Sequence, residues 1–248
     1  GCQAATVFYN ALMVNIAPRN RIGLISGFGK AFGYIGAILA LYLIKPIVLK
    51  SGYRATFLPS GILFLIFSLP CLIFIKDKPQ REKINLVSFI KKAKILEIFR
   101  ALRKTIFDAH ASPGLLDFLK AIFFGLCAVN AVILFMSVYA TKVFGMDESG
   151  VIKLIGFSTF FAVAGSLFSG FISDYLGHRR CLIAVFILWI ICFWAGSFAR
   201  SVTVYLFIGA LVGITLGSTW VVSRALAISL VPQARIGEAF GLFNLVGY

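Results

Sequence analysis

The chain has 248 residues, of which 60% are hydrophobic and 13% charged, and its mean hydropathy is +0.97. Soluble domains carry about 25% charged residues, so this composition excludes a soluble globular domain. The formal net charge of +15 is not accompanied by any basic-aromatic nucleic-acid motif, so no nucleic-acid partner is expected.

From its first residue the chain alternates apolar segments with short polar turns. Residues 1–16 are expected to be part of a first helix, and a turn carrying Arg19 and Arg21 leads into the next. Residues 22–44 form a span interrupted only by Lys30. Five later stretches contain no charged side chain: 55–75, 121–141, 154–173, 181–199 and 201–223. Each has the roughly 20 residues that cross about 30 Å of hydrocarbon, which predicts a multi-pass α-helical membrane protein.

A basic segment, residues 76–114, separates the apolar segments into two groups. Its middle carries apolar side chains at helical spacing, namely Ile95, Ile98, Phe99, Leu102 and Ile106. This pattern predicts an amphipathic helix lying among the headgroups of the inner leaflet. A calmodulin-like or other protein-binding segment is the alternative.

The distribution of Lys and Arg predicts the orientation of the chain. If the loops alternate between the two sides, one side holds 15 of these residues and the other holds 5. The positive-inside rule makes the first side cytoplasmic, and its charge is expected to contact anionic lipid headgroups.

Cysteines and histidines give no sign of a metal site or a cofactor. The five cysteines are scattered through apolar segments, and the two histidines lie in expected loops. We therefore expect neither a metal nor a cofactor, and no enzymatic activity.

An internal repeat relates the two ends of the chain. Residues 10–34 and 224–248 align without a gap and share nine identities in 25 positions. In an apolar chain this favours two membrane halves related by an axis along the bilayer normal. Two unrelated helices that both follow a Pro-containing turn are the alternative.

Glycines recur at spacings that suit close helix packing. Two ridges are expected, one made of Gly209, Gly213 and Gly217 and the other of Gly29, Gly33 and Gly36.

The most specific motif is GFISDYLGHRR at residues 170–180. Its carboxylate, Asp174, stands at the cytoplasmic end of a span, where it can accept backbone N–H bonds from the start of another helix. Such a contact would act as a latch that forms when the cytoplasmic side closes. A solvated turn residue is the alternative reading. The motif resembles the Gly-x-x-x-Asp-Arg-x-Gly-Arg-Arg signature of the major facilitator superfamily through Gly170, Asp174, Gly177, Arg179 and Arg180, while Tyr175 departs from it.

The resemblance extends over nearly the whole chain. FYNALMVNIAPRNR, GFGKAFGYIGA and GSTWVVSRALAISLVPQARIGEAFGLFNLVG are similar to the branch related to the fungal vacuolar amino-acid effluxer, which also has bacterial members. It implies an all-α membrane protein with the major facilitator fold, two pseudo-symmetric six-helix halves, here incomplete at both ends. Residues 1–75 would hold part of span four and spans five and six. Residues 76–114 would form the cytoplasmic linker, and residues 115–248 would hold spans seven to ten and the start of span eleven.

Polar residues deep in the spans are candidates for a substrate cavity. The 214-residue shift superposes Asn10 on Arg224 and Lys30 on Asn244, about 12 Å from the cytoplasmic turn by helix rise. A cation at such depth costs about 2.5–3.5 kcal/mol unless it faces water or a partner. Asn130, mid-span, is a further candidate. For Arg224 and Asn130 an interhelical hydrogen bond is an equal alternative.

These observations predict a monomeric secondary transporter that moves a small solute by alternating access. The cations favour a carboxylate-bearing solute, and the resemblance suggests amino acids and efflux. The host membrane would be the inner cell membrane in a bacterium or the vacuolar membrane in a fungus. A transporter-like sensor or scaffold without flux is the main alternative, and a membrane enzyme acting on lipid is a weaker one.

Overall fold

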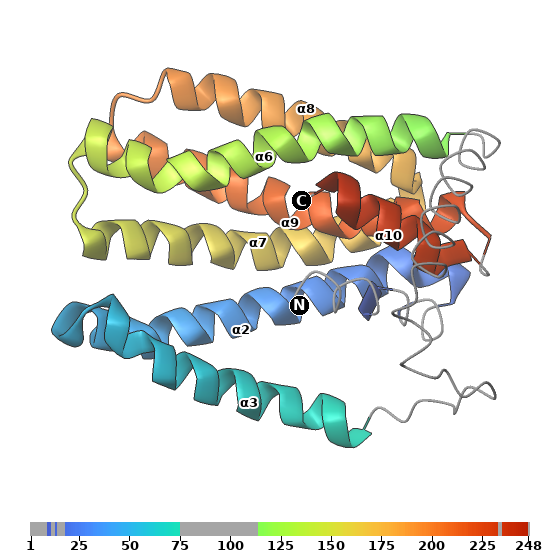
Figure 1. Ribbon diagram of the computed structural model, residues 1–248. Coiled ribbons are helices and arrows are strands. Elements are labelled where there is room, and N and C mark those ends of the chain that lie inside the picture. The colour runs from blue at the N-terminus through green and yellow to red at the C-terminus, as the bar shows by residue number, and fades with distance from the viewer. Residues whose placement is uncertain (1–8, 11–12, 14–17, 75–113, 233–234, 248) are drawn as a thin grey trace, which may run out of the picture. The chain divides into compact units, whose positions relative to one another are not determined.

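The computed structural model describes residues 9–10, 13, 18–74, 114–232 and 235–247, which contain helices and no strand. Two short 3-10 helices, η1 (Arg19–Arg21) and η2 (Tyr53–Thr56), precede α2 and α3. The α-helices of this part of the chain, drawn in Figure 1, are α2 (Ile22–Ser51), α3 (Phe57–Phe74), α6 (Leu115–Phe144), α7 (Glu148–Leu176), α8 (His178–Ser197), α9 (Val202–Leu230) and α10 (Ile236–Gly247). The expected all-α fold is therefore confirmed.

Within the described residues, 6 helices are long and apolar enough to cross a membrane. They match the expected spans, except that α2 continues beyond residue 44 through Pro46 to Ser51. A proline removes one backbone hydrogen bond but is tolerated in a membrane helix, so it does not end α2. The break comes at Gly52, whose φ of 76° suits glycine. The expected loop at 45–54 is consequently short. The amphipathic helix expected within residues 76–114 lies outside the described residues.

The chain divides into two units, residues 1–41 with 114–248 and residues 42–113. All the contacts and cavities described below belong to the first unit. The expected boundaries at residues 75 and 115 stay a prediction.

Short turns connect the successive helices α6, α7, α8 and α9, and each runs antiparallel to the one before it in Figure 1. The Asp147 side chain caps α7 by accepting the N–H of Gly150 at 2.9 Å, and Ser201 caps α9 through the N–H of Val204 at 3.3 Å. Between α7 and α8 the chain reverses at Gly177, whose φ is 91°. A residue with a side chain is strained at that φ, so the sharp turn requires glycine.

Helices α7 and α9 approach one another so closely that their backbones touch. A methyl group on Gly213 would overlap the carbonyl oxygen of Ser158, and one on Gly217 would overlap that of Ala162. On α7, Gly165 meets the backbone of Ile214 in the same way. The expected packing ridge on α9 is therefore confirmed, and small residues make this contact possible.

Of the other expected ridge, on α2, Gly29 is the member that lies against another described side chain, that of Tyr9. Added methyl groups on Gly33 and Gly36 would meet no described atom within 4 Å. It is instead Gly23 and Gly27, near the start of α2, that lie against the backbone of α7.

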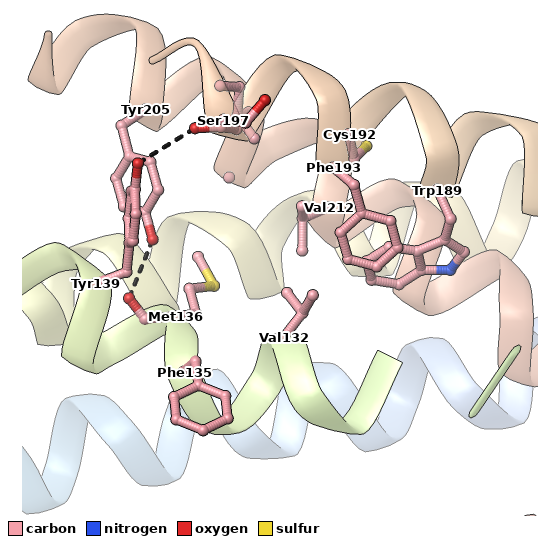
Figure 2. Close-up of a pocket in the computed structure, with 13 residues that line it drawn as sticks. Val132, Phe135, Met136, Tyr139, Trp189, Cys192, Phe193, Ser197, Tyr205 and Val212 are labelled. Atoms are coloured by element: carbon pink, nitrogen blue, oxygen red, sulfur yellow. Dashed lines mark hydrogen bonds between the residues drawn. The ribbon is translucent and has the colours of Figure 1, made fainter. Parts of the chain in front are cut away.

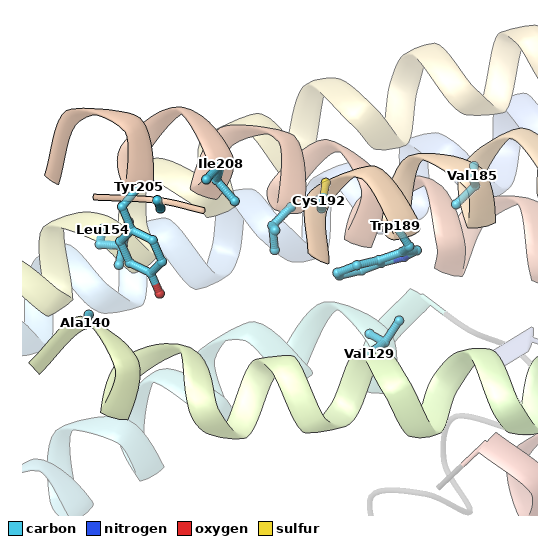
Figure 3. Packing of buried hydrophobic residues seen from close by; sticks show 10 residues of the cluster. Val129, Ala140, Leu154, Val185, Trp189, Cys192, Tyr205 and Ile208 are labelled. Carbon is cyan, nitrogen blue, oxygen red and sulfur yellow. The ribbon is translucent and has the colours of Figure 1, made fainter. Parts of the chain in front are cut away.

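A cluster of buried hydrophobic side chains joins α6, α7, α8 and α9. Figure 3 shows Val129 and Ala140 from α6, with Trp189 and Cys192 from α8 and Tyr205 from α9. The Trp189 ring N–H donates to the Thr219 hydroxyl at 2.9 Å, which satisfies the one polar atom of this buried ring. These four helices therefore form a packed frame for the site.

Candidate functional site

Equivalent backbone hydrogen bonds precede α2 and α10. The N–H of Arg21 donates to the Pro18 carbonyl at 2.9 Å, and the N–H of Arg235 donates to the Pro232 carbonyl at 2.9 Å. Helix α2 begins at Ile22 and α10 at Ile236, again 214 residues apart. The 214-residue offset that aligns the two sequence segments therefore also aligns the starts of the two helices.

Arg224 is buried on α9, with 6% of its surface exposed, and its guanidinium joins three helical segments. Its Nη2 donates to the Ser26 carbonyl on α2 at 3.0 Å, and its Nη1 donates to Oδ1 of Asn10 at 3.3 Å. Its Nε donates to the Trp220 carbonyl, one turn back on α9, at 3.1 Å. In return, the Ser26 hydroxyl donates to the Val221 carbonyl at 3.2 Å. These bonds favour the interhelical role for Arg224.

The contact between Asn10 and Arg224 has a geometric meaning. The two residues occupy equivalent positions of the repeat, and their side chains are hydrogen-bonded to each other. Equivalent residues of two halves touch only where they straddle the axis that relates the halves. The predicted twofold relation between the halves would therefore place its axis beside this pair.

Lys30 lies one turn from Ser26 on α2 and is held by aromatic rings. Its ammonium is 5.1 Å from the ring centroid of Tyr34 and 5.1 Å from that of Trp220. Both distances are within the range of a cation–π interaction. Arg224, which binds the carbonyl of the same Trp220, brings a second positive charge to this group. No salt bridge of Lys30 is found within the described residues, where the contacts of its ammonium are with these two rings.

Asn244 and Asn130 are the two remaining candidates for the cavity, and no hydrogen bond within the described residues joins them to this group. Asn244 is buried on α10, with 8% of its surface exposed. Both atoms of its amide group lack a hydrogen-bond partner in the described part of the chain. Asn130 is half-buried on α6, and no hydrogen bond of its side chain is recorded there. Their predicted role in the cavity stays a prediction.

The Asp174 carboxylate, near the end of α7, lies against the first turn of α2. One oxygen accepts the N–H of Gly23 at 2.7 Å, and the other accepts the N–H of Leu24 at 2.8 Å. The first N–H groups of a helix have no partner within that helix, and they carry the positive end of its dipole. Asp174 therefore supplies two charge-assisted bonds where α2 needs acceptors.

Small residues let α7 approach α2 at this point. A methyl group on Gly170 would lie 2.6 Å from the Gly23 carbonyl oxygen, closer than side-chain carbon atoms come. Gly177 supplies the sharp turn after Asp174, whereas Arg179 and Arg180 are exposed on α8. The geometry thus groups Gly170 and Asp174 at the α2 contact.

A family model described as Major Facilitator Superfamily matches residues 1–248. The chain belongs to the major facilitator superfamily. An uncharacterized protein of Aquifex aeolicus (strain VF5) is 28% identical over 254 residues, which cover 97% of this chain and 60% of that relative. The uncharacterized MFS-type transporter YxiO of Bacillus subtilis (strain 168) is 25% identical over 259 residues, which cover 100% of this chain and 58% of that relative. The chain thus spans about three fifths of the length of these relatives. No solved structure matches it.

This major facilitator chain has a cavity of about 230 Å³ between α6, α8 and α9. Figure 2 shows its aromatic wall, which includes Phe135, Tyr139, Trp189, Phe193 and Tyr205. The two tyrosine hydroxyls are used within the protein. Tyr205 donates to the Met136 carbonyl at 3.0 Å and Tyr139 to the Gly196 carbonyl at 3.3 Å. Among the described residues that line this cavity, none carries a charge.

A second cavity of the facilitator chain, about 180 Å³, lies between α2, α6, α7 and α9. Tyr34, the ring that contacts Lys30, forms part of its wall. This is the cavity that adjoins the polar group described above.

Sequence reasoning missed several residues of the site. Ser26 contributes mainly a backbone carbonyl, which no side-chain pattern reveals. Tyr34 and Trp220 are aromatic residues in an apolar chain rich in such residues, so only their position beside Lys30 distinguishes them. His178 was also overlooked. In the ten-residue signature, His178 stands at the first of the two basic positions that follow Gly177, and Arg179 stands at the second. Arg180 lies one residue beyond the signature.

Proposed function

We propose that the protein is a secondary transporter that carries a small carboxylate-bearing solute by alternating access, with amino acids as the first class to test. Membership of the superfamily supports transport. The matching turns before α2 and α10 support two halves that rock about the axis beside Asn10 and Arg224.

The observation that carries the choice of solute is the environment of Lys30. Its ammonium is fixed between two rings, near a second positive charge, and makes no salt bridge within the described residues. An incoming carboxylate would relieve the repulsion between Lys30 and Arg224 and would take up the donors of Lys30. Arg224 would act by its charge, while its hydrogen bonds hold the helices together.

The contact of Asp174 with α2 is proposed to be the latch of the cytoplasmic side. A hydrogen bond to a charged group contributes about 1.5–3 kcal/mol, so losing it shifts a two-state equilibrium tenfold or more. The bonds to Gly23 and Leu24 would form in the cytoplasm-closed state and break when that side opens. Exposed Arg179 and Arg180 would then contact lipid headgroups or solvent.

The protein is an integral multi-pass membrane protein. The two relatives come from bacteria, which favours the cell membrane as its location. We further propose that it works as a monomer among anionic lipids, and that the branch related to the fungal vacuolar amino-acid effluxer describes its direction of transport.

Transport by the purified intact protein in proteoliposomes, assayed with a mixture of radiolabelled amino acids, tests this function. Lys30→Met should lower the initial rate at least tenfold, because the anion loses its charged partner. Lys30→Arg should retain more activity than Lys30→Met, because guanidinium also binds carboxylates and stacks on rings. Equal rates for the wild type and Lys30→Met would contradict the proposed role of Lys30.

A further inference from the structure

His178 is a titratable side chain at the turn that follows Asp174. It is the first residue of α8, directly after Gly177 and four residues beyond Asp174. The signature that this segment resembles has an arginine at the position of His178, and the charge of an arginine is permanent. A histidine instead gains and loses its charge between about pH 5 and 8. The substitution therefore makes a fixed charge of the turn dependent on pH.

One nitrogen of the His178 ring is enclosed by the protein. The residue is half-buried, and its Nδ1 is buried without a hydrogen-bond partner in the described part of the chain. A neutral ring suits this setting, because it can carry its proton on Nε2 and leave Nδ1 unprotonated. A charged ring carries a proton on both nitrogens, and a buried Nδ1–H without an acceptor is unfavourable. The dipole of α8 also disfavours a positive charge at the first residue of that helix.

Asp174 is the acid that can pair with a charged His178. Helices α7 and α8 flank the turn, η1 and α2 pack against α7, and α9 packs against α8. The described side chains that are charged or titratable within two turns of this end of the five segments are those of Arg21, Asp174, Tyr175, Arg179, Arg180, Cys181 and Arg224. Among them Asp174 supplies the one carboxylate, and tyrosine and cysteine ordinarily titrate above about pH 8.

The carboxylate of Asp174 is engaged by α2 in the contact described above. One oxygen accepts the N–H of Gly23 at 2.7 Å, and the other accepts the N–H of Leu24 at 2.8 Å. If α2 moves away, the carboxylate loses both donors. A protonated His178, across the turn, can then replace them with a charge-assisted hydrogen bond. The closed contact thus suits the neutral ring, and the open contact suits the protonated one.

We propose that His178 makes the contact between α7 and α2 sensitive to pH, so that acidification of the side that this turn faces opens the contact by protonating the ring. The proposal rests on the latch at Asp174 and adds the signal that operates it. The state that binds the extra proton gains population as the pH falls. At about pH 8 the ring is neutral in both states, and at about pH 5.5 the open state is favoured.

The test is the distance distribution between spin labels at Asn20 and Tyr175 in the membrane-reconstituted intact protein, recorded at about pH 8 and about pH 5.5. The fraction with the long distance should rise about fivefold or more in the wild type on acidification. An aspartate ordinarily titrates near pH 3.9, so Asp174 keeps its charge throughout this range.

Three variants assign the response to one ring. His178→Gln stays neutral and should keep the wild-type distribution of the higher pH at both pH values. His178→Arg stays charged and should show the larger long-distance fraction at both. His110→Gln is the matched control, because His110 is the other of the two histidines, and it should respond to pH as the wild type does.

The outcomes separate this proposal from the latch. If Asp174→Asn enlarges the long-distance fraction, the latch stands. A pH-independent wild type, or a response that persists in His178→Gln or disappears in His110→Gln, then overturns the role of His178 alone. If Asp174→Asn changes nothing at either pH, the latch fails and the pH sensitivity of the contact fails with it. Should His178→Gln not yield folded protein, His178→Arg decides, and a closed distribution in that variant at both pH values overturns the proposal.

Discussion

Helix α7 makes two close contacts that look alike in sequence and differ in chemistry. Toward α9 it packs through Gly165 against the backbone that carries Gly213 and Gly217, with no ionic group involved. Toward α2 it packs through Gly170 against Gly23, and there Asp174 closes the contact with two hydrogen bonds. Glycine allows both approaches, but only the second depends on a charge.

The difference indicates which contact is able to open. Backbone packing between α7 and α9 extends along both helices and is lost only if they separate. The α2 contact adds to its glycine packing the two Asp174 hydrogen bonds at a helix start, and these groups can bond to water instead when the contact opens, at a cost of about 1.5–3 kcal/mol. We therefore expect α7 and α9 to move as one body, and α2 to move against them while it exchanges the Ser26 bonds to Arg224 and Val221.

Breaking the α7–α9 contact should have the largest effect. Gly213→Leu forces a side chain onto the Ser158 carbonyl, and overpacking of this kind costs about 3 kcal/mol or more when backbones cannot part. The expected result is a large loss of monodisperse protein and a lower Tm. Gly33→Leu, at a position of α2 where no described atom lies within 4 Å of an added methyl group, is the matched control and should behave as the wild type. A normal Tm for Gly213→Leu would mean that the two helices are not closely packed.

Removing the guanidinium that joins α9 to α2 should have the second-largest effect on stability. Arg224→Met leaves the Ser26 carbonyl and the Asn10 amide buried with fewer partners, which we expect to cost about 2–4 kcal/mol. Denaturant unfolding in detergent measures this loss. Arg200→Met, at an exposed position, should change stability by less than about 0.5 kcal/mol. Full stability of Arg224→Met together with lost transport would favour a role in solute binding alone.

Neutralising the carboxylate at the α2 contact should shift a conformational equilibrium more than it unfolds the protein. Asp174→Asn keeps the size of the side chain but loses the charge and one acceptor, which favours the open contact by about tenfold. Hydrogen exchange at the Gly23 and Leu24 amides should accelerate by a similar factor. Exchange elsewhere in α7 should stay unchanged, and uniform acceleration would indicate general destabilisation instead.

The smallest effect on stability is expected for a substitution of Asn10, the partner of Arg224. Asn10→Ala removes one hydrogen bond of 3.3 Å from Arg224, whose guanidinium keeps its carbonyl partners. The expected loss is about 1 kcal/mol, read from the unfolding midpoint. A loss as large as that of Arg224→Met would show that Asn10, rather than the Ser26 carbonyl, is the main partner.

The sequence was sufficient for the features that depend on residue type alone. Charge-free stretches predicted the spans, and the repeat predicted equivalent turns, because both depend on residue types along the chain and not on which segments meet in space. The sequence did not reveal a contact whose partner is a backbone atom, nor which face of a helix packs against its neighbour. Arg224 binds the Ser26 carbonyl, which leaves no mark in the sequence. Gly23 and Gly27 meet α7, whereas Gly33 and Gly36 do not, although their spacing looks as good.

The central claim is that the α2–α7 contact at Asp174 opens and closes while α7 and α9 stay together. The most direct measurement is the distance distribution between spin labels at Asn20 and Tyr175, which are exposed beside this contact, in the membrane-reconstituted protein. We predict a short and a long population in the wild type, with the long one enriched about tenfold in Asp174→Asn. A single unchanged distribution in both proteins would contradict the claim.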